Sequence, residues 1–204
     1  MEIAFKKSSK TFHLYNDRIS YIMQVLPNGQ MGQLYFGKKV RDREDFSYLL
    51  ETLPRPMSSC VFEDSKSFSL DHIRQEYPSY GTGDYRTPAV EVLQENGSKI
   101  TDFIYKGHHI ISGKPGLEGL PATYVEAENE AATLILSLED ELTGLSLELF
   151  YTIFTDRSVI TRSARFANRG REKLHLTNAM SLCLDLPDYN YDWIQFSGAW
   201  ARER

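Results

Sequence analysis

Aromatic and acidic side chains alternate near the end of the chain, in a pattern that suits the binding of a sugar. The segment Asp188-Tyr-Asn-Tyr-Asp-Trp193 is followed by Gly198-Ala-Trp-Ala-Arg-Glu-Arg204. Aromatic rings can stack on the apolar C–H face of a sugar, while carboxylates and guanidinium groups bind its hydroxyl edge. A partly exposed terminal strand with ordinary interface aromatics would show the same spacing. The candidate ligand-binding residues are Tyr189, Tyr191, Trp193 and Trp200.

Catalysis by this segment finds little support. Cleavage of a glycoside needs two carboxylates, one that protonates the leaving group and one that acts as nucleophile or base. Asp188 and Asp192 are the tempting pair, but their spacing in an irregular stretch is more typical of carboxylates that bind hydroxyls or cap turns. The chain has 28 acidic residues, and spacing singles out no other pair. We therefore expect no catalytic residue within this chain.

The histidines lack the spacing of metal ligands. His108 and His109 are adjacent on an expected strand, so their side chains point to opposite faces and do not readily share one ion. Three further histidines have no ligand-type residue at a suitable spacing: His13, His72 and His175. We expect neither a metal nor an organic cofactor.

Nucleophilic catalysis and anion binding are no better supported. Cys60 and Cys183 are far apart and without an activating pattern, which favours two reduced thiols, with one disulfide as the alternative. The glycines of residues 113–119 lie between two expected strands, whereas a phosphate-binding loop lies between a strand and a helix. Arg162 and Arg165 could bind an anion, but arginines on an exposed strand usually form rim salt bridges.

The composition is that of an ordinary globular protein. Hydrophobic residues make up 41% of the 204 residues and charged residues 25%. The net charge of −5 and the lack of a basic run argue against nucleic-acid binding. No apolar run has the length of a membrane span, and residues 1–7 lack the apolar stretch of a secretion signal. We therefore expect a cytoplasmic protein without nucleic-acid or membrane partners.

Alternating apolar and polar residues predict β-strands along most of the chain. Asn-Gly pairs at 28–29 and 96–97, each between two such runs, predict tight hairpins. So many strands joined by polar turns indicate an all-β fold, a large antiparallel β-sandwich forming a single domain over residues 1–204. The expected strands cover residues 12–15, 20–26, 31–36, 90–94, 100–105, 122–126, 132–138, 145–151, 159–166 and 174–184.

One long stretch, residues 40–88, breaks this pattern, and we refer to it as the excursion. It is rich in proline, serine and glycine. A connection this long is unusual in a compact domain and is often functional. Within it, Ser69-Leu-Asp-His-Ile-Arg-Gln-Glu-Tyr77 predicts a short helix, capped by Ser69 and ended by Pro78.

Several segments spread over essentially the whole chain form a more specific pattern. They are Phe68-Ser-Leu-Asp71, Gln75-Glu-Tyr-Pro-Ser-Tyr-Gly81, Gly119-Leu-Pro-Ala-Thr-Tyr-Val-Glu126, Val159-Ile-Thr-Arg-Ser-Ala-Arg-Phe166, and Tyr191-Asp-Trp193 with Gly198-Ala-Trp-Ala-Arg-Glu-Arg204. Together they resemble the N-terminal domain of bacterial family-36 α-galactosidases. The resemblance implies a β-supersandwich followed by a (β/α)8 barrel and a small C-terminal β domain.

The resemblance also implies that catalysis takes place in another domain of the enzyme. The barrel would hold both catalytic aspartates of a retaining enzyme that acts on terminal α-galactosyl units of melibiose, raffinose and stachyose. Nothing in this chain matches the barrel motif, and the sequence stops directly after a charged cluster. We therefore expect a fragment that ends before the catalytic barrel and is inactive by itself.

Individual residues take roles from the same resemblance. Trp200 matches a tryptophan that contacts the substrate, and Tyr191 matches a tyrosine near the sugar pocket. We include Trp193 with them as a substrate-binding residue because it belongs to the same aromatic cluster.

The excursion supplies a further candidate. Arg55 matches the arginine of an acid–arginine pair that reaches the sugar in some relatives. The acid of that pair appears here as Pro54, and Glu51 is the alternative source of a carboxylate.

The implied partners are the chain's own catalytic barrel, an α-galactoside substrate, and further copies in a homo-oligomer, a tetramer in many members of the family. A competing hypothesis is a standalone β-sandwich module that binds a carbohydrate or a protein through the same aromatic surface. That module would bind its ligand as an isolated chain, whereas a pocket wall without its barrel would bind sugar weakly or undetectably.

Overall fold

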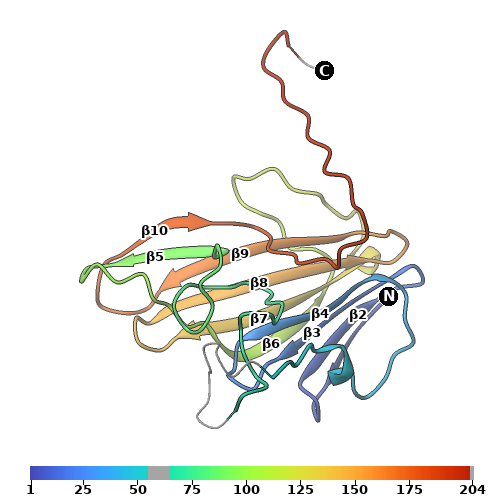
Figure 1. Cartoon of the computed structure of the whole chain (residues 1–204). Coiled ribbons are helices and arrows are strands. Elements are labelled where there is room, and N and C mark those ends of the chain that lie inside the picture. Colours follow the sequence, from blue (N-terminus) through green and yellow to red (C-terminus); the bar gives the residue numbers. More distant parts are fainter. Residues whose placement is uncertain (55–64, 203–204) are drawn as a thin grey trace.

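The computed structural model describes residues 1–54 and 65–202, which fold almost entirely into β-strands (Figure 1). Helical structure among them is limited to two short 3-10 helices, η1 (Ser47–Leu49) and η2 (Glu128–Glu130). None of these helices is long and apolar enough to cross a membrane. The strands are β1 (Glu2–Lys6), β2 (Thr11–Tyr15), β3 (Ile19–Val25), β4 (Met31–Lys38), β5 (Val90–Gln94), β6 (Ile104–Ser112), β7 (Ala131–Asp140), β8 (Leu145–Phe154), β9 (Ile160–Asn168) and β10 (Leu174–Ala179).

Two four-stranded antiparallel sheets form the sandwich. One has the order β1-β2-β3-β4 and the other β6-β7-β8-β9, while β10 and β5 form a separate two-stranded sheet. Alternate residues of β8 enter the core, among them Leu147, Leu149 and Tyr151, none more than 2% exposed. They share one apolar cluster with Phe12 and Met23 of the first sheet. Each such side chain contributes about 1.5–3 kcal/mol by burial. The predicted antiparallel β-sandwich is confirmed.

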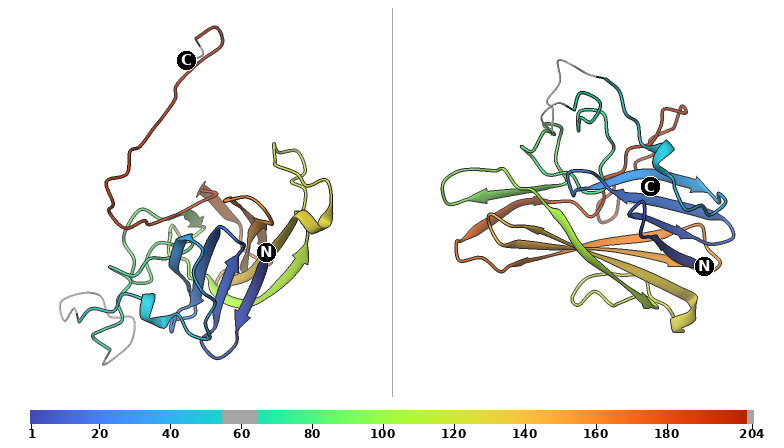
Figure 2. Two further views of the ribbon diagram at one scale, coloured as in Figure 1. Left: turned by 90° about the vertical axis from the view of Figure 1, so that its right-hand side faces the viewer. Right: turned by 90° about the horizontal axis from the view of Figure 1, so that it is seen from below.

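The described parts of the excursion, residues 40–54 and 65–88, form a third layer on the outer face of the first sheet (Figure 2). Phe46 is 1% exposed and packs on Ile22 and Leu34, which point away from the sandwich core. Further along, Leu70 joins a second cluster with Leu26. Apolar contacts therefore hold these parts of the excursion to the sheet, in agreement with the expectation of a long connection over the surface of the domain.

The predicted helix at residues 69–77 is wrong. The Ser69 hydroxyl oxygen accepts the Asp71 N–H at 3.3 Å in a local turn, and Gln75 then forms an antiparallel bridge with Gly32 of β4. The Glu76 N–H donates to the Met31 oxygen at 2.9 Å. Because β4 has a free edge, the main chain of this segment bonds to the sheet and not to its own preceding turn.

Only one of the two predicted hairpins forms as expected. The Asn-Gly pair at 28–29 joins β3 and β4, with Gly29 at a φ of 86°. The pair at 96–97 also makes a tight turn, in which the Gly97 N–H donates to the Gln94 oxygen at 3.0 Å. The pairing predicted to follow it is wrong, because β5 pairs with β10 while β6 begins at Ile104 in the other sheet. An Asn-Gly pair specifies the local turn, whereas distant strands decide the partner.

The predicted strand at residues 122–126 is also wrong. These residues belong to the exposed connection between β6 and β7, which pair directly with each other. Since β6 and β8 occupy both edges of β7, the connection has no edge of that strand to join. It remains irregular up to η2, where β7 begins.

Candidate functional site

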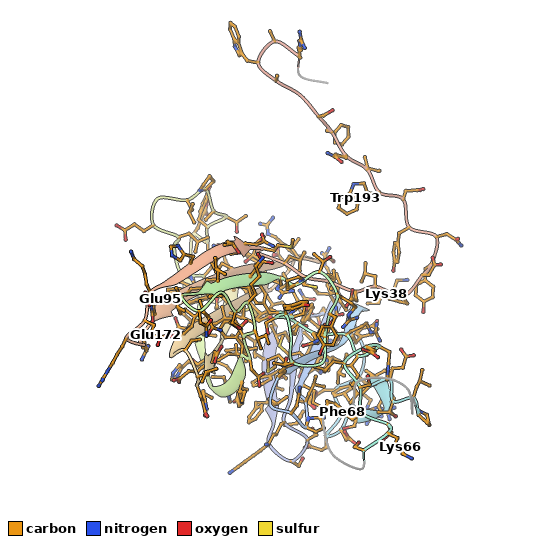
Figure 3. All side chains as sticks on the ribbon, turned by 60° about the vertical axis from the view of Figure 1, so that its left-hand side comes forward. Lys38, Lys66, Phe68, Glu95, Glu172 and Trp193 are labelled. Carbon is orange, nitrogen blue, oxygen red and sulfur yellow. The ribbon has the colours of Figure 1, made fainter. Side chains whose placement is uncertain are left out.

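The predicted sugar-binding aromatics lie on an extended segment that leaves the sandwich, residues 185–202, which we call the tail (Figures 1 and 3). Tyr191 is 61% exposed, Trp193 90% and Trp200 94%. The three residues therefore share a segment, but the described part of the sandwich does not cover them. Large apolar faces remain in solvent, which is typical of a surface that meets a partner or ligand.

The tail contains local turns. The Asn190 N–H donates to the Asp188 carboxylate at 3.3 Å, and the Arg202 N–H donates to the Ala199 oxygen at 2.7 Å. Asn190 has a φ of 57°, which redirects the chain between Tyr189 and Tyr191. The ring centroids of these two tyrosines lie 6.3 Å apart. These contacts bring neighbouring aromatics together without forming an enclosed pocket.

The second predicted sugar contact lies elsewhere. Arg55 is outside the described residues, while Glu51 and Pro54 on the preceding stretch are exposed. On the other side of the gap, Lys66 and Phe68 lie at the opposite end of the molecule from Trp193 (Figure 3). The described flank of the excursion and the tail therefore point in different directions.

Residues 180–184, the root of the tail, are firmly attached to the sandwich. The Met180 N–H donates to the Ala89 oxygen at 2.8 Å, and the Tyr77 hydroxyl donates to the Met180 oxygen at 2.5 Å. One guanidinium nitrogen of Arg162, on β9, donates to the Cys183 oxygen at 3.0 Å. The tail thus starts from a fixed position.

Arg162 belongs to a buried polar cluster centred on Glu76, which is 0% exposed. The Glu76 carboxylate accepts the Tyr21 hydroxyl at 2.7 Å and the Tyr151 hydroxyl at 2.8 Å. An Arg162 nitrogen lies 3.3 Å from the same carboxylate and donates to the Glu76 main-chain oxygen at 3.0 Å. The cluster therefore joins the excursion, both four-stranded sheets and the root of the tail.

The ionisation of this cluster follows from burial. Burial and the adjacent Glu76 carboxylate raise the pKa of Tyr21 and of Tyr151 well above the ordinary value, so both hydroxyls remain protonated and donate. Burial alone would lower the pKa of Arg162, but Tyr151 and Glu76 outweigh it and the pKa is raised. Because its members hydrogen-bond to one another in this way, the cluster suits a fixed geometry and not proton transfer.

An apolar cleft of about 240 Å³ lies beside the root. Its walls come from the two sheets and from the root itself, and Phe36 and Leu182 at its mouth are 36% and 47% exposed. The lining residues are Tyr21, Phe36, Ile160, Arg162, Ser181, Leu182 and Leu184. This lining offers apolar contact next to the point where the tail leaves the sandwich.

The two strand arginines have different environments. Arg165 faces outward and its guanidinium donates to Glu148 at 2.6 Å, the rim salt bridge that the sequence favours. Arg162 has a side chain only 8% exposed and is committed to Glu76 and Cys183. No local pattern marks Glu76, since its partners lie 55, 75 and 86 residues away in the chain.

Ser20 and His13 of the first sheet also lie in line with Asp42 at the start of the excursion. His13 Nδ1 is 2.8 Å from Asp42, and His13 Nε2 is 2.9 Å from the Ser20 hydroxyl oxygen. Ser20 and His13 are both 0% exposed, and the Ser20 oxygen also accepts the Val40 N–H at 3.0 Å. Burial withholds the hydroxyl from any substrate, so the three residues fasten the start of the excursion to the sheet. Their sequence spacing gives no indication of this arrangement.

The other histidines do not form a metal site. The His108 ring packs on Phe5 in a tilted arrangement with ring centroids 4.5 Å apart, while the adjacent His109 is exposed, so the two side chains lie on opposite faces as predicted. Within residues 1–54 and 65–202, no group of three or more His, Cys, Asp or Glu side chains could hold a metal ion.

Comparison with known proteins matches the fold to one family. Residues 29–204 match the glycosyl hydrolase family 36 N-terminal domain. The chain is 48% identical over 204 residues to alpha-galactosidase AgaA of Geobacillus stearothermophilus, covering 100% of this chain and 28% of that protein. It is 37% identical over 203 residues to alpha-galactosidase Mel36A of Lactobacillus acidophilus, covering 99% of this chain and 28% of the relative. The chain thus spans less than a third of the length of these relatives.

Solved structures agree. The alpha-galactosidase of Lactobacillus brevis superimposes with a TM-score of 0.93 at 43% identity, over 99% of this chain and 27% of that one. Alpha-galactosidase AgaB of Geobacillus stearothermophilus gives a TM-score of 0.90 at 46% identity, over 100% of this chain and 28% of that one. A variant of AgaA solved in complex with raffinose gives 0.88 at 49% identity, over 96% of this chain and 27% of that one.

Proposed function

The chain belongs to the glycosyl hydrolase family 36 N-terminal domain family, and on this premise we propose that it is the non-catalytic N-terminal domain of an α-galactosidase. The enzyme would remove terminal α-galactosyl units from oligosaccharides of the melibiose and raffinose type. The observation that carries the proposal is the identity of 48% along the whole chain to an α-galactosidase of which it spans 28%.

The chemistry would reside outside this domain. A retaining glycosidase needs two facing carboxylates at the substrate. The most deeply buried acids described here are engaged with their neighbours: Glu76 binds two tyrosines, Asp84 binds Arg86 at 2.9 Å, and Asp140 accepts the Asp102 N–H at 3.3 Å. Catalytic acids at the strand ends of a following (β/α)8 barrel fit this distribution of roles.

The tail would line the substrate pocket. Trp200, Tyr191 and Trp193 keep 61–94% of their surface exposed, so their rings are free to pack against a galactosyl unit and the barrel. A stacked tryptophan supports the apolar face of galactose, and nearby Asp or Arg groups orient its hydroxyls. Arg55 is proposed as a second contact, from the excursion.

We also propose that the enzyme is a homo-oligomer, with a tetramer as the expected form. The described flank of the excursion at Lys66 lies far from Trp193 of the tail (Figure 3). One copy would therefore not bring both the excursion and the tail to the same sugar. A pocket formed by both segments would take the excursion from one copy and the tail from another. A cytoplasmic location is part of the proposal, and the low cysteine content, two in 204 residues, supports it.

The test is an activity measurement on the full-length enzyme with an aryl α-galactoside. We expect the full-length protein to release the aryl group, and the 204-residue chain to release none under the same conditions. A full-length protein without α-galactosidase activity would refute the proposal. Activity of the isolated chain would place the catalytic acids within it and would equally refute the assigned role.

A further inference from the structure

The direction of the tail depends on a small number of contacts at its root. Met180 binds Ala89 and Tyr77, and Cys183 binds Arg162. Cys183 and Leu184 also pack against the main core cluster. The hydrogen bonds described further along the tail are local, between residues two or three positions apart. Whatever orients the root therefore orients the aromatic segment that follows.

Among the residues that hold the root, Arg162 has several partners in different parts of the fold. Its guanidinium donates to the Cys183 oxygen at 3.0 Å, to the Glu76 main-chain oxygen at 3.0 Å and to the Tyr151 hydroxyl at 3.1 Å, and its charge lies 4.7 Å from the Tyr151 ring centroid. Such a planar fork makes several hydrogen bonds at fixed angles, which a lysine ammonium does not reproduce. The root is therefore held by a group that has little freedom of its own.

Glu76 fixes Arg162 in turn. Its carboxylate is bound by Tyr21 from β3 and by Tyr151 from β8, so it is attached to both layers of the sandwich. A buried carboxylate needs a charged partner, and removal of one member of such a pair leaves the other uncompensated. The pair is thus a rigid link between the sandwich core and the root.

From this arrangement we propose that Arg162, oriented by Glu76, is a positioning residue for substrate binding: it sets the direction in which the tail carries Tyr191, Trp193 and Trp200 to the sugar. The inference rests on the proposed function. The inference extends the proposed function, because it assigns control of the aromatic contacts to a residue that does not touch the substrate.

The first arm of the test uses this chain and amide hydrogen exchange. Arg162→Lys keeps a positive charge beside Glu76 but loses the fork that reaches Cys183. We expect the Met180 amide, which donates to the Ala89 oxygen, to exchange about tenfold faster, while β10 keeps its protection. Arg165→Lys, on the outward face of the same strand, is the matched control and should match the wild type. Unchanged exchange in Arg162→Lys would overturn the proposed anchoring.

The second arm uses the full-length enzyme. Arg162→Lys should raise KM for an aryl α-galactoside about tenfold with kcat within about twofold, because binding geometry changes and the catalytic acids do not. Arg165→Lys should leave both constants unchanged. Faster exchange at the root with an unaltered KM would overturn the role in substrate binding. An inactive wild-type enzyme would instead refute the proposed function, while the exchange result would still decide the anchoring.

A second variant covers the case in which Arg162→Lys fails to fold. Tyr77→Phe removes the 2.5 Å bond to the Met180 oxygen and leaves the buried charges intact. It should loosen the root and raise KM in the same direction, with Tyr85→Phe, an exposed tyrosine, as its control. A folded Tyr77→Phe enzyme with wild-type exchange and KM would overturn the proposal.

Discussion

The side chain of Asn16 donates a hydrogen bond of 2.7 Å to the main-chain oxygen of Phe154, 138 residues later in the chain. Its second amide hydrogen binds the Arg157 oxygen at 2.8 Å, and its own oxygen accepts the N–H groups of Arg18 and Ile19. Asn16 is 2% exposed. One amide therefore closes the β2–β3 turn and attaches it to the end of β8 in the opposite sheet.

Asn16→Asp should lower the free energy of unfolding by about 2–4 kcal/mol, because a carboxylate faces two carbonyl oxygens that then lack donors. Chemical denaturation of the two chains measures the difference. Asn96→Asp is the control: Asn96 is exposed and uses only its oxygen, to accept the Ser98 N–H, which an aspartate also does. A loss in Asn16→Asp no larger than in the control would contradict the assigned role.

The buried His13 should make stability fall on mild acidification. Burial lowers its pKa below the ordinary 6.5, and the adjacent Asp42 offsets this only in part, with Lys6 also lowering it. The folded state therefore favours the neutral ring; its stabilisation is complete above pH 6.5 and is lost as pH falls through the lowered pKa.

His13→Gln should accordingly show a shallower decline in the free energy of unfolding between about pH 7 and 5. Denaturant midpoints at several pH values measure this slope. His109→Gln, at an exposed position of β6, should retain the wild-type slope. Equal slopes in the wild type and His13→Gln would show that another group titrates.

Gly170 lies where two turns meet. A Cβ on Gly170 would come within 2.0 Å of the Thr143 oxygen, and a Cβ on Gly144 within 2.8 Å of the Gly170 main chain. Gly170→Ala should therefore lower the free energy of unfolding by about 1–3 kcal/mol. Gly107→Ala, which meets nothing within 4 Å, should change it by less than about 0.5 kcal/mol. Thermal unfolding of both variants measures the difference. Equal shifts in their unfolding temperatures would contradict the predicted steric clash at Gly170.

In the full-length enzyme, Trp200→Ala should reduce kcat/KM for an aryl α-galactoside by about tenfold to a hundredfold, because the stacking face for the sugar is lost. Tyr124→Ala, at a 79% exposed position between β6 and β7, is the control and should leave the kinetics unchanged. Unaltered kinetics in Trp200→Ala would remove its proposed role.

Fluorescence of the isolated chain reports on the tail alone, since its two tryptophans are Trp193 and Trp200. Both are at least 90% exposed, so we expect emission typical of tryptophan in water and no change on addition of galactose or raffinose. A saturable shift would instead support the standalone binding module. We expect no binding because the tail supplies only one wall of the sugar pocket, and the barrel would supply the other.

Much of the strand content could be predicted because alternation is a local property. The segments around Ser20, Ala132 and Leu145 alternate with the period of a strand, and they are strands β3, β7 and β8. Predictions from local sequence were wrong where the main chain forms hydrogen bonds to a distant strand. The segment after Ser69 has a capping residue and a terminating proline, Pro78, yet it bonds to the free edge of β4.

The sequence alone determined most of the strands, the Asn28-Gly29 hairpin, the family pattern and the aromatic character of the tail. Only the tertiary structure decided that Arg162 is buried against Glu76, that Ser20, His13 and Asp42 fall in line, and that the tail's aromatics leave the sandwich. The physical reason is range. Periodicity and turn preference act between residues a few positions apart, whereas these contacts join residues up to 86 positions apart and exist only after the strands have paired in register.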